Sequence, residues 1–290
     1  MPNVRDIRRR IRSVENTSKV TNAMSLIAAS KMRRAQQAVT QGRPFAEKIL
    51  EIIAHLAAQP PDDSSDSGVA QPLLQVRPVQ RVGVLVISPD RGLCGGMHGN
   101  LNRAVAQFIL AQPVPVRVIV AGRKGRDFMV RTGQDVQAVF TDLGERPDLA
   151  DTIAMSRLVI DAYSEGEVDE VYMAYTKYVS TVTQDPVVEK LLPVTPAELT
   201  GAERVGYIYE PDSLTVLENL LPRFVDMEVY HSLLESIASE QSARMVAMRN
   251  ATDNANGLVD DLTLVMNKLR QDSITNELLD LIGGQVALEG

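Results

Sequence analysis

The residues with the clearest chemical potential form a glycine-rich segment between a predicted strand and a predicted helix, Asp90-Arg91-Gly92-Leu93-Cys94-Gly95-Gly96. Glycine loops in this position can bind phosphate groups through their backbone N–H groups. The glycine spacing here matches neither the dinucleotide pattern nor the nucleoside triphosphate pattern. We therefore interpret the segment as a tight turn or a packing contact with a partner, and we keep a nucleotide site as the alternative.

The remaining reactive side chains predict no catalytic residue, no metal site and no cofactor. Cys94 is the only cysteine, which excludes an internal disulfide and a four-cysteine zinc site, and a small buried residue is its default interpretation. His55, His98 and His231 do not share the spacing of metal ligands. No Ser/His/Asp or paired-carboxylate pattern stands out. The chemistry of this chain is therefore expected to lie in its contacts.

Small and apolar residues alternate at intervals of three and four along the first helical stretch, residues 3–57. This spacing is typical of a coiled coil, and it makes the middle of the contact polar. The segment Gly42-Arg43-Pro44 predicts a bend or an interruption of the helix. The predicted seam consists of Val4, Ile7, Ile11, Val14, Ser18, Thr21, Ser25, Ala28, Met32, Ala35 and Val39.

A second long helix with the same spacing is predicted over residues 212–283. At about 1.5 Å per residue it would be roughly 100 Å long, and its tip around Leu262–Ile282 would extend past the first helix. Apolar residues on that tip would need a partner with an apolar socket. The predicted seam is Tyr230, Leu234, Ile237, Gln241, Arg244, Met248, Ala251, Ala255, Leu258, Leu262, Val265, Leu269, Asp272, Asn276 and Leu279.

Strand and helix patterns alternate between the two long helices, which predicts a mainly parallel sheet. The strand candidates are Val82–Ser88, Val116–Ala121, Val136–Phe140, Val168–Tyr175 and Tyr178–Thr183, the last as an added hairpin or edge strand. The helix candidates are Asn100–Ala111, Lys124–Thr132 and Leu149–Glu165.

The predicted fold class is α/β with a long coiled coil. An antiparallel coiled coil of the N- and C-terminal helices accompanies a central Rossmann-like domain. The expected boundaries are 1–58 for the first helix, 59–78 for a linker, 79–210 for the α/β domain and 211–290 for the second helix.

Charge is distributed unevenly between the two ends of the chain. Residues 1–43 carry ten bases and two acids, whereas residues 214–290 carry five bases and twelve acids. The basic end alone would suggest nucleic acid, but the Arg5–Arg12 cluster has no interleaved aromatic residues. Pairing of the two helices explains the split more simply, with a nucleic-acid scaffold as a further alternative. The chain also has no apolar run of about 18–20 residues and no apolar signal segment, so we expect a protein without a membrane span.

Three segments carry a resemblance to a known family. They are NVRDIRRRIRSVENTSKVTNAMSLIAASKMRRAQ near the start, DRGLCGGMHGNL in the middle, and EQSARMVAMRNATDNANGL followed by NKLRQDSITNELLDLIGG. In this order they resemble the gamma subunit of bacterial-type F-type (rotary) ATP synthases, over essentially the whole chain.

The resemblance implies a central rotor shaft without catalytic residues of its own. Such a shaft transmits torque between the ion-driven c-ring and the hexameric ring of alpha and beta subunits, and so couples ion transport to ATP synthesis or hydrolysis. It also contacts the epsilon subunit, occurs once per complex and reaches the membrane only through partners. The implied location is peripheral, at the cytoplasmic face of the bacterial plasma membrane. The alternative is a nucleotide-binding regulatory protein with coiled-coil arms.

The resemblance also assigns contact residues. The positions matched to beta-subunit contact and coupling are Met24, Arg244, Arg270, Gln271, Thr275 and Glu277. The positions matched to the foot near the c-ring and epsilon are Tyr207, Tyr209 and Glu210. Cys94 matches the cysteine of the family's glycine segment. A single cysteine is inconsistent with the two-cysteine regulatory insert of the chloroplast type, so no thiol switch of that kind is expected.

Overall fold

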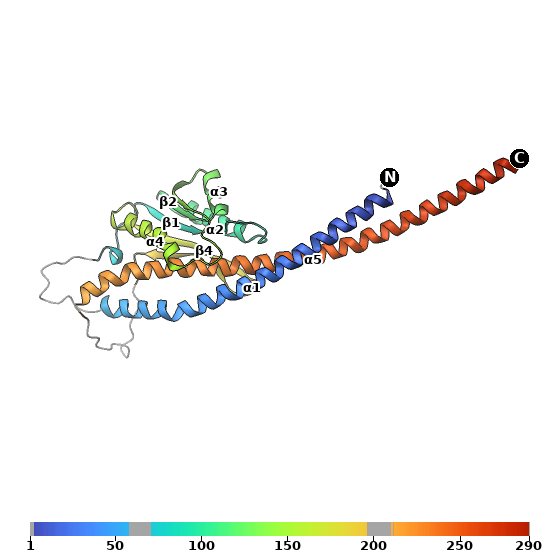
Figure 1. The fold of residues 1–290 in the computed structure, drawn as a ribbon. Coiled ribbons are helices and arrows are strands. Elements are labelled where there is room, and N and C mark those ends of the chain that lie inside the picture. The colour runs from blue at the N-terminus through green and yellow to red at the C-terminus, as the bar shows by residue number, and fades with distance from the viewer. Residues whose placement is uncertain (1–2, 58–70, 196–209, 211, 290) are drawn as a thin grey trace. The chain divides into compact units, whose positions relative to one another are not determined.

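The computed structural model describes residues 3–57, 71–195, 210 and 212–289 of the chain (Figure 1). Its elements in chain order are α1 (Val4–Ala57), η1 (Pro72–Leu74), β1 (Val82–Ile87), α2 (Met97–Ala111), β2 (Val116–Ala121), α3 (Arg123–Arg131), β3 (Asp135–Phe140), α4 (Leu149–Ser164), β4 (Glu170–Tyr178), β5 (Gln184–Leu192) and α5 (Ser213–Glu289).

The central sheet has five strands in the order β3-β2-β1-β4-β5. β1 pairs in parallel with both β2 and β4, and β2 pairs in parallel with β3. Only β5, at one edge, runs antiparallel to its neighbour. Every residue of β1 is buried, as expected for the middle strand of a parallel sheet that is covered on both faces. The predicted mainly parallel, Rossmann-like sheet is therefore confirmed.

Alternate residues of β1 serve two different apolar cores. Val82, Val84 and Val86 pack with Leu101 of α2 and Met129 of α3 on one face. The opposite face is covered by α4 together with the end of α1 and the beginning of α5. Its core includes Leu85 and Ile87 of β1, Met155, Val159 and Tyr163 of α4, Ile49 and Ile53 of α1, and Leu221, Val225 and Val229 of α5. The long terminal helices are thus also core elements of the α/β domain.

The chain forms two compact units, to which α1 and α5 both contribute. The head unit is Ala29–Ala243 and contains the sheet. The helix-pair unit is Met1–Ala28 together with Arg244–Gly290. α5 is continuous through Ala243 and Arg244, so one helix belongs to both units.

Two predicted features differ from the structure. Of the bend or interruption predicted at Gly42-Arg43-Pro44, the interruption is wrong, because α1 continues through Pro44. Pro44 has no N–H group, so the Thr40 carbonyl lacks its usual donor within the helix. Both residues are exposed, and water can donate to this carbonyl instead. The fifth strand also begins at Gln184 rather than Tyr178. Residues 179–183 form the hairpin turn instead, where Ser180 Oγ accepts the Thr183 N–H at 3.0 Å.

Part of the expected linker 59–78 belongs to the head. Leu73 of η1 is buried in the core beside the sheet, and its carbonyl accepts the Val194 N–H at 2.9 Å. Residues 58–70 lie outside the described part of the chain.

Candidate interaction surfaces

Polar contacts join the two helices in the middle of the helix-pair unit. Ser18 Oγ donates to Asn256 Oδ1 at 2.7 Å, and the hydroxyl oxygens of Thr21 and Thr252 lie 2.6 Å apart. Residue numbers rise along α1 as they fall along α5, so the helices run antiparallel, as predicted. All eleven seam residues predicted in α1 are buried or half-buried.

The seam of α5 differs in part from the predicted one. Ala255 is buried as expected, but Leu258 is 40% exposed and Val265 is 46% exposed. The next residues along the chain, Val259 and Met266, are half-buried in their place. Apolar residues lie on both sides of the α5 seam. The side that holds Val259 and Met266 faces α1, whereas the three-and-four spacing predicted the side that holds Leu258 and Val265.

The N-terminal arginine cluster is exposed. None of these arginines forms an ion pair with a residue in the described part of the chain, although α5 carries an excess of acids. The opposite charges of the two helices therefore act at a distance rather than through contact pairs, which favours orientation more than affinity. The exposed residues of the cluster are Arg5, Arg8, Arg9, Arg10 and Arg12.

Two of the predicted coupling residues, Met24 and Arg244, lie in the helix-pair unit and are half-buried. Met24 lies on α1 between the half-buried Thr21 and the buried Ser25, at the edge of the contact. A partner that touches α1 at this point would meet the Met24 side chain together with Val20 and Ile27, which lie on the same face of the helix and are 59% and 53% exposed.

The other predicted coupling residues lie on the tip of α5. Every residue from 270 to 282 is exposed, including Arg270, Gln271, Thr275 and Glu277. Within the described part of the chain, this group makes one side-chain hydrogen bond, a long one from Ser273 Oγ to Glu277 Oε1 at 3.4 Å. The large apolar residues exposed along the last part of the helix are Leu264, Val265, Ile274, Leu278, Leu279, Leu281 and Ile282. This surface combines an apolar patch with charges, which is typical of a segment that inserts into a partner.

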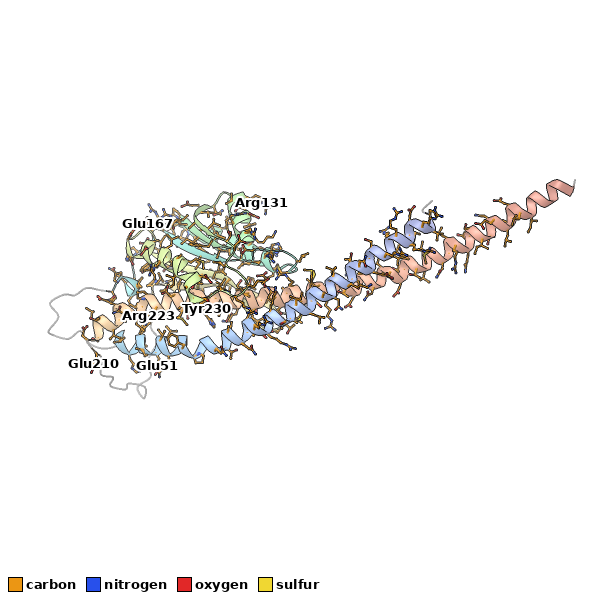
Figure 2. The ribbon with its side chains drawn as sticks, in the orientation of Figure 1. Glu51, Arg131, Glu167, Glu210, Arg223 and Tyr230 are labelled. Atoms are coloured by element: carbon orange, nitrogen blue, oxygen red, sulfur yellow. The ribbon has the colours of Figure 1, made fainter. Side chains whose placement is uncertain are left out.

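The predicted foot is described only at Glu210, which is exposed (Figure 2). Tyr207 and Tyr209 lie outside the described residues. Two residues after Glu210, Asp212 caps the beginning of α5, since its Oδ1 accepts the Thr215 N–H at 2.8 Å. That backbone hydrogen bond holds the pKa of the Asp212 carboxyl below its usual value.

The glycine-rich segment forms a turn stabilised by its own chain. Leu93 and Gly95 have positive φ angles of 65° and 59°. The Asp90 carboxylate accepts two backbone N–H groups, from Arg123 and Asp142, each at 3.0 Å. Cys94 is fully buried in a small apolar cluster, in agreement with its default interpretation. The polar groups of this loop are thus engaged in joining the ends of β1, β2 and β3.

α5 crosses the place where a nucleotide would bind in an open parallel sheet. In such folds, the ligand occupies the crevice at the carboxyl ends of the strands where the strand order reverses, here between β1 and β4. Ser236 Oγ of α5 lies 3.4 Å from the Ile87 carbonyl at the end of β1, and Ser239 Oγ donates to the Thr176 carbonyl of β4 at 2.9 Å. The helix therefore fills this crevice.

Sequence reasoning missed this contact, although a signal was present. Ser232, Ser236, Ser239 and Ser242 recur at intervals of four, three and three, a second stripe beside the predicted seam. All four are buried. Small residues at helical spacing indicate close approach of a helix to another surface, but they do not say which surface.

Three acids gather where α5 packs on β4 and β5: Glu228 and Glu235 are half-buried and Glu189 is exposed. Burial raises the pKa of the Glu228 carboxyl; His231 opposes the rise, and Glu189 and Glu235 add to it. Burial, with Glu189 and Glu235 nearby, also raises the pKa of the Tyr175 hydroxyl, which donates to Glu189 Oε2 at 2.9 Å.

In the described part of the chain, no group of histidine, cysteine or acidic residues has the arrangement of a metal site. No helix among the described residues is long and apolar enough to cross a membrane.

Comparisons with known proteins agree along the full length of the chain. A family model described as ATP synthase matches residues 3–288. The ATP synthase gamma chain of Dehalococcoides mccartyi strain CBDB1 is 57% identical over 288 residues, which cover 99% of this chain and 100% of that protein. The ATP synthase gamma chain of Roseiflexus sp. strain RS-1 is 46% identical over 292 residues, with 99% of each chain covered.

Solved structures share the fold. A chain of the Euglena gracilis mitochondrial ATP synthase, from the OSCP/F1/c-ring part in rotational state 3, has a TM-score of 0.66 at 18% identity and covers 98% of this chain and 94% of its own. A chain of the rotor of the same enzyme has a TM-score of 0.63 at 16% identity, with coverages of 93% and 98%. The solved structures share the fold, and the bacterial relatives match the sequence over its full length. The chain therefore belongs to the family of ATP synthase gamma chains.

Proposed function

We propose that this chain is the central rotor shaft of a bacterial F-type ATP synthase, transmitting torque between an ion-driven c-ring and a catalytic ring of alpha and beta subunits. The observation that carries the proposal is the exposed tip of α5, in a chain that matches gamma chains from end to end. Every residue from 270 to 282 is exposed, and many of them are large and apolar. An exposed apolar surface of this kind is typical of an interaction site for a partner.

The helix pair is suited to carry torque. Two helices wound together resist twisting better than one helix, and the hydrogen bonds of Ser18 and Thr21 fix the register between them. Small residues such as Ala29 and Ser30 offer little to obstruct turning inside a sleeve. Arg244 and Arg270 would form ion pairs with passing beta subunits, but an exposed pair contributes only about 0–1 kcal/mol. Coupling is therefore assigned to the shape of the shaft rather than to any single charge.

The partners follow from the same proposal. The tip of α5, with Arg270, Gln271, Thr275 and Glu277, would lie within the alpha and beta ring. The foot around Glu210, with Tyr207 and Tyr209, would contact the epsilon subunit and the c-ring. The chain would be present once per complex, would carry out no catalysis itself and would be held at the cytoplasmic face of the membrane by its partners.

Purification of the chain with an affinity tag from its own cells tests this proposal. We expect alpha, beta and epsilon subunits to co-purify with it, and we expect the isolated chain to hydrolyse no ATP. Membrane vesicles from cells that lack the chain should lose ATP-driven proton pumping, and a plasmid-borne copy should restore it. ATP hydrolysis by the pure chain, or full pumping without it, would contradict the assignment.

The alternative, a nucleotide-binding regulator with coiled-coil arms, is disfavoured by the position of α5. Buried serine side chains of α5 occupy the crevice where the ligand would bind, and the Asp90 carboxylate is already engaged by two backbone N–H groups. Calorimetry of the isolated chain with ATP and NAD separates the two functions. We expect no heat of binding from either nucleotide.

A further inference from the structure

The contact between α5 and the head changes character along the helix. In the lower part, from Leu217 to Leu233, α5 contributes large buried apolar side chains to the core. Tyr230 adds a hydrogen bond to the Pro147 carbonyl at 3.3 Å (Figure 2). Beyond Leu234, most buried residues of α5 in the head are small: Ser236, Ala238, Ser239, Ser242 and Ala243, with Gln241 as the larger exception. This part of α5 is therefore attached to the head mainly by small groups, beside the partly buried Ile237.

Two of these groups make short hydrogen bonds to the main chain of the sheet. Ser239 Oγ donates to the Thr176 carbonyl at 2.9 Å, and Ser242 Oγ donates to the Thr181 carbonyl at 2.8 Å. Both serines are fully buried. The bond from Ser236 to Ile87 is longer, at 3.4 Å, and contributes less.

The Thr176 carbonyl lies where the neighbouring strands offer few donors. Its partner across the antiparallel pair is Pro186, which has no N–H group. On the other side, the Ser88 N–H at the end of β1 already donates to the Ala121 carbonyl at 2.8 Å. Loss of the Ser239 hydroxyl would remove a hydrogen bond from this buried carbonyl, which is unfavourable.

The Thr181 carbonyl belongs to the turn between β4 and β5. The turn is closed by its own hydrogen bonds, from Ser180 N to Thr183 O at 3.0 Å and from Gln184 Nε2 to Thr181 O at 3.0 Å. Ser242 thus attaches α5 to a stiffened loop at the far end of β4, about one helical turn beyond Ser239.

We propose that Ser239 and Ser242 form a hydroxyl clamp that fixes the rotational setting of α5 on the head, so that torque passes between head and helix at this point. Large interlocked side chains resist the turning of a helix, but small side chains such as Ala238 offer little to interlock. A hydrogen bond requires a defined distance and angle, so two of them one turn apart hold the helix in a single setting. The clamp rests on the proposed rotor function.

The double variant Ser239→Ala/Ser242→Ala, in the assembled complex, tests the clamp. We expect hydrogen exchange of the amides in residues 178–184 and 236–243 to become roughly five- to thirty-fold faster, as the loss of one or two hydrogen bonds allows. ATP hydrolysis should continue, while the number of protons pumped per ATP should fall. Exchange in β1 should remain slow, which verifies that the head is folded.

Two matched variants separate the hydrogen bond from other effects. Ser232→Ala removes the hydroxyl of an equally buried serine two turns lower on α5 that makes none of these bonds, so pumping should be unchanged. The double variant Ser239→Cys/Ser242→Cys keeps nearly the same volume with a weak donor, so it should behave like the alanine variant. Ser242→Ala alone should show a smaller loss of the same kind.

Three outcomes would overturn the clamp. They are normal pumping despite faster exchange, normal pumping in the cysteine variant, or an equal defect in Ser232→Ala. Each leaves the rotor assignment intact, because that assignment fails only if vesicles without the chain still pump protons.

Discussion

Hydroxyl groups make several of the specific contacts of α5. In the helix-pair unit, Thr252 meets Thr21 at 2.6 Å, and in the head Ser239 and Ser242 reach main-chain carbonyls at 2.9 and 2.8 Å. Exposed charges contribute little to stability and are screened by salt. Buried hydroxyl contacts are not screened, so the setting of the helix should be insensitive to ionic strength.

Met24 is the residue at which a single added charge should matter. Replacing it with lysine puts a cation on a half-buried position at the edge of the seam. The lysine stem can reach solvent, so we expect the stability of the isolated chain to fall by only about 1 kcal/mol or less. In vesicles, we expect fewer protons pumped per ATP, because the charge would lie against a beta subunit.

Met24→Gln is the matched control, since it is polar and of similar length but uncharged. It should retain most of the coupling. Equal pumping ratios for wild type and Met24→Lys would show that Met24 does not face a charge-sensitive partner.

At the residue level, sequence could identify the seam of α1 but not the whole seam of α5. The α1 seam is correct because only one face of that helix has small and apolar residues in a regular order. On α5, Leu258 and Val265 on one flank are as apolar as Val259 and Met266 on the other. Only the position of α1 decides between the flanks, and that information is not local.

At the level of elements, α5 has the most roles. It is a single helix of 77 residues that completes the core of the head, fills the crevice between β1 and β4, and pairs with α1 in the helix-pair unit. Sequence predicted the helix and its pairing. It did not predict the crevice contact, because the serine stripe shows only that something approaches closely. The position of the fifth strand was wrong for a related reason, since apolar and β-branched residues at 179–183 look like a strand although the side chain of Ser180 closes a turn there.

Glu228, where α5 packs on the edge of the sheet, should make the stability of the head depend on pH. Its pKa is raised by burial above the ordinary value of 4.5, with His231, Glu189 and Glu235 facing it and Lys177 beside Glu189. A raised pKa means that the folded state holds the proton more tightly, so stability falls as pH rises through and above 4.5. Glu228→Gln should therefore raise the free energy of unfolding by about 1 kcal/mol at pH 8.

The difference between this variant and wild type should shrink as pH falls below 4.5, where the wild-type carboxyl becomes protonated in both states. Urea unfolding at several pH values measures it. Glu15→Gln, which removes an exposed charge on α1, should show no such trend. A gap for Glu228→Gln that stays constant from pH 5 to pH 8 would mean that Glu228 is ionised in the folded head.

At the level of the whole molecule, the sequence specifies two kinds of surface. The head closes on itself, because both faces of its sheet are covered by helices of the same chain. The end of α5 is different, because residues 270–282 are exposed and no other described residue of the chain covers them. Family membership could be inferred from sequence because the matching segments extend over the full length. The contact residues themselves remain proposals that depend on the partners.

The tip of α5 should therefore stabilise the complex and not the chain. Changing Leu278, Leu281 and Ile282 to glutamine keeps the helix length and helix propensity. These side chains are 53%, 70% and 59% exposed, so the unfolding temperature of the isolated chain should not change. In the complex, each apolar side chain that is no longer buried should cost about 1.5–3 kcal/mol of association free energy.

Mass photometry of the complex after stepwise heating measures this loss as the fraction of particles that retain the chain. The matched control changes Asp260 and Asp261 to asparagine, polar residues of α5 outside the apolar patch, and should retain the chain as wild type does. If the triple variant is retained equally well, the tip turns in a wide or water-filled opening rather than an apolar socket. In that case the shaft would be held by its head and foot alone. The small residues along α1 and α5 would then keep the shaft from touching the surrounding ring rather than pack against it.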